Sequence, residues 1–278
     1  MTNQIYPCLW FDGQAKEAAD FYCSIFKNSK ITIDTSLVVL FEINGNKFMG
    51  LNGGPVFKFT PAISVFVLCE TIQETNETWN QLIDGGKVLM PIDKQPWSER
   101  YGWLQDKFGL TWQISVVNNA GDKQKITPSF LFTGNQFGRA EEAVKFYTSV
   151  FDNSSIDSLL HYPEQDNNAG KVMYSEFKLN QYKLIAMDGP GAHDYTFNEA
   201  VSIVVNCETQ NEIDHYWNKL TELGEESRCG WLKDQFGVSW QIIPSVIGEL
   251  MSDPVKAPNV MNEVLKMKKI DLKTLLNA

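Results

Sequence analysis

The chain of 278 residues carries a net charge of −10, and apolar residues make up 43% of it. This length allows two domains with their own cores, and the composition is that of a globular protein. The acidic balance disfavours nucleic acid and anionic membranes as partners, because both require a basic surface. We find no run of about 18 apolar residues and no signal peptide, so we expect a cytoplasmic protein without membrane association.

The cysteines form an odd and widely spaced set. They are Cys8, Cys23, Cys69, Cys207 and Cys229. This spacing matches neither a disulfide framework nor the CxxC pairs of a zinc site. We therefore expect free thiols in a reducing compartment.

The first module predicted along the chain begins with an apolar strand at 5–11. The segment 16–26 then has the apolar periodicity of an amphipathic helix, and Asn28 is well placed to end it in a left-handed conformation. Strands at 37–43 and 47–51 are expected to pair across an Asn-Gly-Asn turn. The order is strand, helix, strands.

A second module then repeats this order. A buried strand at 62–68 precedes a helix at 74–83, and a strand follows at 87–91. The segment GWLQDKFGLTWQIS at 102–115 predicts a β-hairpin whose turn needs a positive φ at Gly109. The first half of the chain thus contains two similar modules.

The second half of the chain repeats the first. The segment GWLKDQFGVSWQII at 230–243 shares nine of fourteen residues with 102–115, which indicates an internal duplication. Two loops differ between the copies: 154–192 is longer than its counterpart, while 87–101 is shortened to 225–229. Because loops shape pockets, we expect the two halves to have different pockets.

A polar linker at 119–125 joins the halves, and the repeat ends after Pro244. Beyond it, Asp253-Pro254 and the apolar residues that follow predict a helical tail. We expect this tail to dock across the two domains. The alternative is that it binds a partner.

The helix pattern AxxFYxxxF at 18–26 and 143–151, the segment FMGLNGGP at 48–55 and the GWLxDxFGxxWQI blocks resemble a known family. It is the PhnB-like family of the vicinal oxygen chelate superfamily, which includes glyoxalase I, bleomycin-resistance proteins and extradiol dioxygenases. The resemblance implies an α+β fold of tandem βαβββ modules, two of which form one cup-shaped mixed sheet. It implies two glyoxalase-like domains, at 1–120 and 121–245, and a C-terminal helical tail at 246–278.

The superfamily's chemistry rests on a divalent metal held by His, Gln or Glu from four strands. The resemblance places the matching positions at Pro7, Pro128, Gly50, Ala186, Ile63, Val201, Gln113 and Gln241. Only the two glutamines carry a donor atom, and one neutral amide is too little for a metal site. We therefore expect no metal and no cofactor.

Three repeated pairs of side chains are candidate ligand-binding residues. They are Gln113 and Gln241, Trp103 and Trp231, and Arg100 and Arg228. An amide can hydrogen-bond a ligand, an indole can stack on a flat one, and a guanidinium can bind a carboxylate or phosphate. Each has a structural alternative: a glutamine bonded to backbone, a tryptophan in the core, and an arginine paired with Asp106 or Asp234 on its hairpin.

Other catalytic patterns are missing from the sequence. The histidines His161, His193 and His215 have no counterparts in the other repeat and fit no metal-binding motif. Members of the PhnB-like family are often labelled demethylubiquinone methyltransferase. A methyltransferase of the usual kind needs a glycine-rich turn between a strand and a helix, whereas Gly53-Gly54 is followed by proline and a strand.

The leading hypothesis is a metal-independent protein that binds a planar or amphipathic small molecule, as a monomer or homodimer. One alternative is a divalent-metal lyase, isomerase or dioxygenase of the same superfamily, in which Glu42, Glu176 or Asp188 reaches a cup. Another is a regulatory module whose tail recruits a partner and whose cups are filled by side chains. The fold alone does not choose among these functions.

Overall fold

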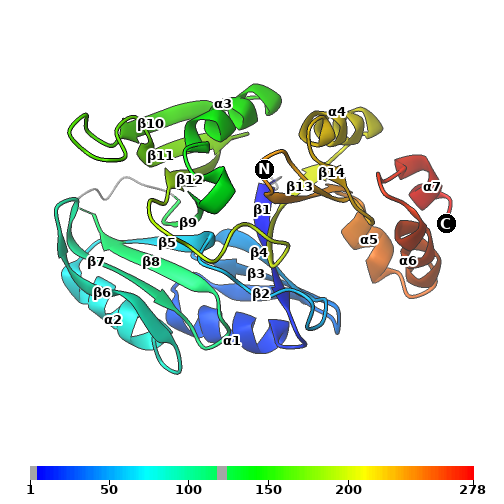
Figure 1. The fold of residues 1–278 in the computed structure, drawn as a ribbon. Coiled ribbons are helices and arrows are strands. Elements are labelled where there is room, and N and C mark those ends of the chain that lie inside the picture. Colours follow the sequence, from blue (N-terminus) through cyan, green and yellow to red (C-terminus); the bar gives the residue numbers. More distant parts are fainter. Residues whose placement is uncertain (1–4, 118–123) are drawn as a thin grey trace.

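The computed structural model describes residues 5–117 and 124–278, which form four βαβββ modules and a helical tail (Figure 1). The first module contains β1 (Ile5–Phe11), α1 (Ala15–Ile25), β2 (Lys30–Asp34), β3 (Val38–Ile43) and β4 (Asn46–Asn52). The second contains β5 (Ile63–Cys69), α2 (Ile72–Leu82), β6 (Lys87–Gln95), β7 (Ser98–Gln105) and β8 (Thr111–Val116).

The second half repeats this order. The third module contains β9 (Ile126–Phe132), a short 3-10 turn at Gly134–Gln136, α3 (Ala140–Val150), β10 (Ser155–His161), β11 (Val172–Leu179) and β12 (Tyr182–Asp188). The fourth contains β13 (Val201–Cys207), α4 (Gln210–Thr221), β14 (Glu225–Glu226), β15 (Trp231–Lys233) and β16 (Ser239–Pro244). The tail consists of α5 (Ile247–Ser252), α6 (Ala257–Lys266) and α7 (Leu272–Leu276).

The modules pair across the two halves of the chain. One eight-stranded sheet has the order β14-β15-β16-β13-β1-β4-β3-β2, and the other has the order β10-β11-β12-β9-β5-β8-β7-β6. The modules meet through antiparallel pairing of β1 with β13 and of β5 with β9. We call the concave faces of these sheets cup A and cup B, respectively.

The two cup-shaped sheets are as expected, but neither is built from one half of the chain. The expectation that modules one and two form one sheet is wrong, because β1 pairs with β13 and not with β5. The boundaries 1–120 and 121–245 remain a prediction about the sequence repeat, and their junction lies outside the described residues.

The helices cover one face of each sheet and leave the other face to the cups. Helices α1 and α2 lie along one side of the molecule and α3 and α4 along the other, with the strands between them (Figure 1). On β5, Ile63, Val65 and Val67 enter the main core, while Phe66 belongs to a separate apolar cluster on the opposite face. The cups are therefore the faces turned away from the helices.

Local sequence signals explain where several elements begin and end. Helix α2 begins at Thr71, whose hydroxyl accepts the backbone N–H of Glu74, and α4 begins with a full capping box. Asn28 has a φ of 56° just beyond α1, which confirms the expected left-handed residue. Gly109 has the expected positive φ, at 95°.

A buried aspartate explains the repeated hairpin motif. The carboxylate of Asp106 accepts the hydroxyl of Tyr22 and the indole N–H of Trp112, both at 2.8 Å, and two backbone N–H groups of its own turn. Asp234 makes the same four bonds in the second copy. The turn, the helix tyrosine and the returning strand are thus tied together in each repeat.

The tail docks on the fourth module. The backbone N–H groups of Cys229 and Gly230 donate to the carbonyls of Met267 and Lys268, each at 2.8 Å. Further bonds join Gln210 of α4 to the backbone near the start of α7. These contacts correct the expectation that the tail bridges both halves. The tail occupies the place that the long β6–β7 hairpin takes in the second module, where the fourth module has only the short β14–β15 pair.

No helix in the described part of the chain is long and apolar enough to cross a membrane.

Candidate ligand-binding site

Six of the eight positions expected for metal ligands face the helices instead of the cups. Ile63, Val201 and Ala186 belong to the main core, and a Cβ on Gly50 would lie 3.0 Å from the Cβ of Ala15 in α1. The remaining two, Pro7 and Pro128, alternate with cup-facing residues on β1 and β9. The expected register is therefore wrong by one residue on these strands, and only Gln113 and Gln241 face the cups.

The strand pairing shows which side chains occupy the cup floors. Residues that pair in register on adjacent strands point to the same face of the sheet. The floor of cup A contains Cys8, Met49, Ser202 and Gln241. The floor of cup B contains Ser64, Gln113, Ser129 and Ile185.

These floor residues do not fit a hard divalent metal. Hydroxyl, amide and thioether groups are neutral, whereas hard divalent metals prefer carboxylate oxygens and borderline metals such as Zn, Fe and Ni also take imidazole. Burial raises the pKa of the Cys8 thiol to about 12, so it stays protonated at neutral pH. Among the described residues, no group of three or more His, Cys, Asp and Glu side chains is placed to hold a metal ion.

The three acids proposed to reach a cup have different positions. Glu176 shares the face of Ile185 in cup B, accepts the hydroxyl of Tyr174 at 2.5 Å and lies 3.8 Å from the ammonium of Lys183. Asp188 instead accepts backbone N–H groups at the start of α3 and at Val172, so it has a structural role.

Glu42 pairs across the ladder with Lys47, whose ammonium lies over the ring of Tyr6 in cup A. Its carboxylate lies 3.5 Å from the ammonium of Lys30. Each cup thus has at most one of the three acids on its face, and that acid already has a cationic partner.

The two repeated glutamines are held by other floor residues. Gln113 accepts the hydroxyl of Tyr101 at 2.7 Å and donates to the hydroxyl of Ser64 at 2.6 Å. Gln241 donates to the hydroxyl of Ser202 at 2.9 Å. Both amides are 5% exposed, so they fix the floor of each cup. Their predicted role in ligand binding stays a prediction.

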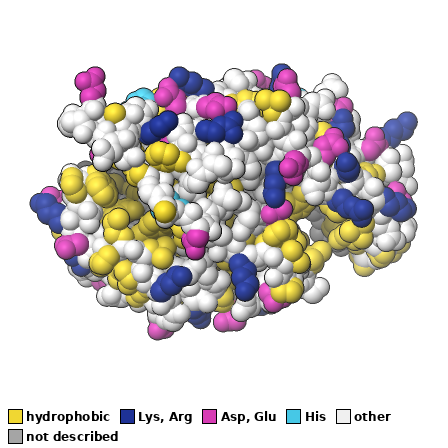
Figure 2. All heavy atoms as spheres, in the orientation of Figure 1, with side chains coloured by type: hydrophobic (Ala, Val, Ile, Leu, Met, Phe, Trp, Pro, Cys, Tyr) yellow, Lys and Arg dark blue, Asp and Glu magenta, His cyan; other side chains and the backbone are white. Residues whose placement is uncertain are grey.

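The floor of cup B is apolar around this glutamine. Phe66, Tyr101 and Ile185 are buried there, and the rings of Phe66 and Tyr101 lie 6.3 Å apart. Figure 2 shows apolar side chains gathered in this region of the molecule, on the left of the view. Trp103 lies beside Gln113 on the same face, and its indole N–H is buried without a hydrogen-bond partner among the described residues.

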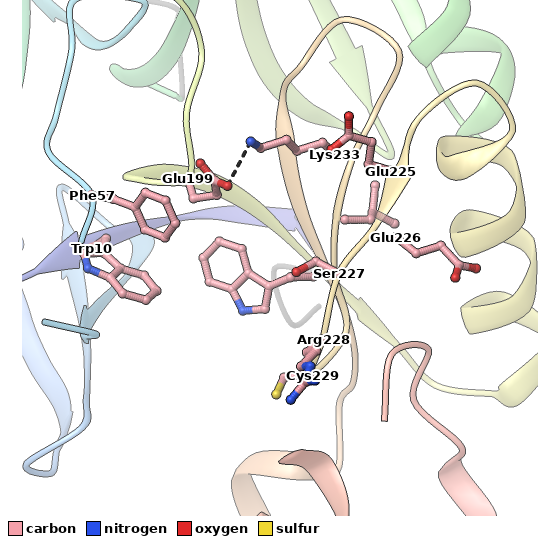
Figure 3. Close-up of a pocket in the computed structure, with 11 residues that line it drawn as sticks. Trp10, Phe57, Glu199, Glu225, Glu226, Ser227, Arg228, Cys229 and Lys233 are labelled. Carbon is pink, nitrogen blue, oxygen red and sulfur yellow. Dashed lines mark ion pairs between the residues drawn. The ribbon is translucent and has the colours of Figure 1, made fainter. Parts of the chain in front are cut away.

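A cavity of about 340 Å³ opens at the mouth of cup A (Figure 3). Trp231 and Arg228 line it together with Trp10 and Phe57. The ring centroids of Trp10 and Trp231 are 5.9 Å apart and those of Trp10 and Phe57 are 5.0 Å apart, both edge to face. The cavity therefore has three aromatic walls from distant parts of the chain.

The position of Trp10 is fixed by the backbone around it. Its indole N–H donates to the carbonyl of Gly54 at 2.7 Å. A Cβ on Gly53 would lie 2.1 Å from the Trp10 ring, so only glycine allows this approach. Sequence reasoning missed both Trp10 and Phe57. No alternation on β1 marked the tryptophan as a cavity residue, because both faces of that strand are apolar.

The repeated arginines do not share one environment. Arg100 faces α2, where its Nε donates to the side chain of Asn76 at 2.7 Å, whereas Arg228 lies in the turn before β15 and lines the cavity. Neither has an ion pair with Asp106 or Asp234, whose partners are those of the hairpin network. The site thus contains Arg228 and Trp231, and not Arg100.

The sequence profile of the 3-demethylubiquinone-9 3-methyltransferase family matches residues 3–115 and 124–243. The chain belongs to this family. A Bacillus cereus structure described with the same methyltransferase name and as a PhnB protein is 35% identical, covering 40% of this chain and 98% of that one, with a TM-score of 0.39. No match was found among curated proteins.

Glyoxalase I from Zea mays has the same fold as this member of the 3-demethylubiquinone-9 3-methyltransferase family. The two chains are 12% identical, with a TM-score of 0.55 over 90% of this chain and 95% of the maize protein. At this identity the match shows the fold alone. The fold is thus glyoxalase-like, as expected from the sequence.

The residues present do not fit the methyl donor that the family name implies. S-adenosylmethionine enzymes of the usual kind bind it at a glycine-rich turn that opens a helix. In this family member Gly53 follows β4, packs against Trp10 and leads through a loop into β5. No helix begins there, so we derive no methyl transfer from this segment.

Proposed function

We propose that the chain is a metal-independent protein that binds a planar or amphipathic organic molecule in the cavity of cup A. The observation that carries the proposal is the open cavity of about 340 Å³ whose aromatic walls are Trp10, Phe57 and Trp231. Ligand sites are typically mostly apolar cavities with a few placed polar groups, and this size falls at the lower end of their usual range. The neutral cup floors support a function without a metal.

The proposal includes a reducing, cytoplasmic setting. The five cysteines carry free thiols, and burial raises the pKa of Cys69 to about 11 and of Cys207 to about 12. Thiols of this kind are poor nucleophiles and unreactive. Cys69 and Cys207 therefore act as packing residues.

Binding of the neutral fluorescent probe N-phenyl-1-naphthylamine tests the proposal. We expect saturable binding to the wild-type chain and at least about tenfold weaker binding to Trp231→Ala, because that variant loses one aromatic wall. Trp103→Ala is the matched control, since it removes the equivalent tryptophan from cup B and leaves the cavity intact. Equal affinity in the wild type and Trp231→Ala would refute the site.

A further inference from the structure

Two of the three carboxylates that line the cavity of cup A have cationic partners within the described part of the protein. Glu199 pairs with Lys233 at 2.8 Å, as the dashed line in Figure 3 marks. Glu226 pairs with Lys268 of the tail at 3.2 Å and accepts the indole N–H of Trp217. Glu225 faces Lys233 across the β14–β15 ladder. The ion pair of Lys233 is with Glu199.

Arg228 differs from these charged residues. Its guanidinium has no hydrogen-bond or ion-pair partner among the described residues, although it lines the cavity. The chain has three arginines, and the other two are engaged. Arg100 donates to Asn76, and Arg139 donates to the carboxylate of Glu142. Arg228 is therefore a cation with unused donors at an aromatic cavity.

The backbone beneath Arg228 is fixed, so ligand binding would order only its side chain. Its carbonyl accepts the N–H of Trp231 at 2.9 Å, and the N–H groups of Cys229 and Gly230 donate to the tail. Cys229 has a φ of 59°, a conformation that a non-glycine residue adopts only when its surroundings hold it. The tail thereby fixes the backbone segment from which the side chains of Arg228 and Trp231 extend.

Charge is distributed unevenly around the cavity. In Figure 3, Arg228 lies at one end of the lining and Glu225 at the other, and Trp10 and Phe57 form the side between them. A guanidinium binds a carboxylate or sulfonate through two parallel hydrogen bonds, and indole faces accept flat rings. An acidic group on the ligand is favoured only at the Arg228 end.

We propose that the ligand is a planar aromatic anion, with its acidic group on Arg228 and its ring against the aromatic wall that Trp231 and Trp10 form. This inference rests on the proposed function, because it assigns chemistry to the same cavity. It also distinguishes the two cups, since the arginine of the other repeat faces α2 and not cup B. Cup A then has a charge preference that cup B lacks.

Two probes that differ by one acidic group test the proposal. The anion 8-anilinonaphthalene-1-sulfonate has the same rings as N-phenyl-1-naphthylamine, which has no sulfonate. We expect the wild-type chain to bind the anion about tenfold more tightly, the size of one charge-assisted contact near the surface. Arg228→Gln should lose this preference and keep its affinity for the neutral probe. Arg100→Gln is the matched control and should keep the preference.

The outcomes separate the two proposals. If neither probe binds, both the cavity assignment and the charge preference fail. If both probes bind the wild type equally, or if Arg228→Gln keeps the preference, the cavity stands and the anionic ligand is refuted. A preference that falls as salt is raised to about 0.5 M supports the ion pair, because exposed charges are screened at that ionic strength. Arg228 is exposed, so circular dichroism should show unchanged folding in the variant.

Discussion

The buried carboxylate of Asp234 gives the fold a specific dependence on pH. Burial raises the pKa of Asp234 to about 6 from the ordinary 3.8, although four hydrogen bonds act in the opposite direction. The folded state therefore binds a proton that the unfolded state has released between these values. A raised pKa of this kind adds stability at low pH, and that contribution is lost as pH rises through about 6.

The magnitude follows from the two pKa values. Linkage predicts that this single group loses about 1.4 kcal/mol of unfolding free energy between about pH 5 and pH 7.5. Asp234→Asn cannot titrate, so the stability difference between the wild type and this variant should shift by that amount. The substitution also places an amide N–H against the indole N–H of Trp240, which accepts no hydrogen bond. This adds a cost of about 1–3 kcal/mol at every pH.

Urea denaturation followed by tryptophan fluorescence at about pH 5 and 7.5 measures both quantities. Comparing the two proteins at each pH cancels the titration of all other groups. If the wild type gains stability over the variant as pH rises, the hydrogen bonds outweigh burial and the reasoning is wrong. Where Asp234→Asn does not fold, Tyr147→Phe serves instead. It removes one donor that holds the charged form, and it should steepen the loss of stability with rising pH.

Two further predictions concern the walls of the cavity. Gly53→Ala should displace the Trp10 ring, destabilise the chain by about 2 kcal/mol or more and weaken binding of N-phenyl-1-naphthylamine, because the new Cβ overlaps the indole. Gly248→Ala, where a Cβ meets nothing within 4 Å, is the control and should be neutral or stabilising in thermal melts. Ile270→Ala should lower the free energy of unfolding by about 2–4 kcal/mol, because this buried residue packs the tail against Gly230. It should also weaken binding of N-phenyl-1-naphthylamine. Unchanged probe affinity in a folded Ile270→Ala would contradict the positioning role of the tail.

The repeat itself made most of the fold predictable. The hairpin motif and the helix pattern, each present twice, indicated the modules, and the asparagines and glycines of the turns were found where expected. Strand β2 went unnoticed because it is a short edge strand, mostly exposed, with only Ile31 and Ile33 as apolar residues. The pairing of modules across the halves was not predictable either. Because the modules resemble one another, either β5 or β13 could form the backbone hydrogen bonds with β1.

The site was harder to predict because the central strands are buried on both faces. In β1, six of seven residues are buried, so the sequence gives no alternation from which to choose the cup face. This is why six expected ligand positions were displaced by one residue. The arginines show a second limit. The motif predicted the same role for both, but the shortened hairpin of the fourth module places Arg228 in a turn, while Arg100 lies within β7.

Metal dependence of probe binding tests the central claim most directly. The metal content of the chain as purified is measured by elemental mass spectrometry; the chain is then treated with a chelator, and N-phenyl-1-naphthylamine is titrated with and without Mn, Fe, Ni or Zn. We predict no retained metal and the same affinity in every titration. About one retained metal ion per cup, or binding that requires an added metal, would contradict the account and favour a divalent-metal lyase, isomerase or dioxygenase.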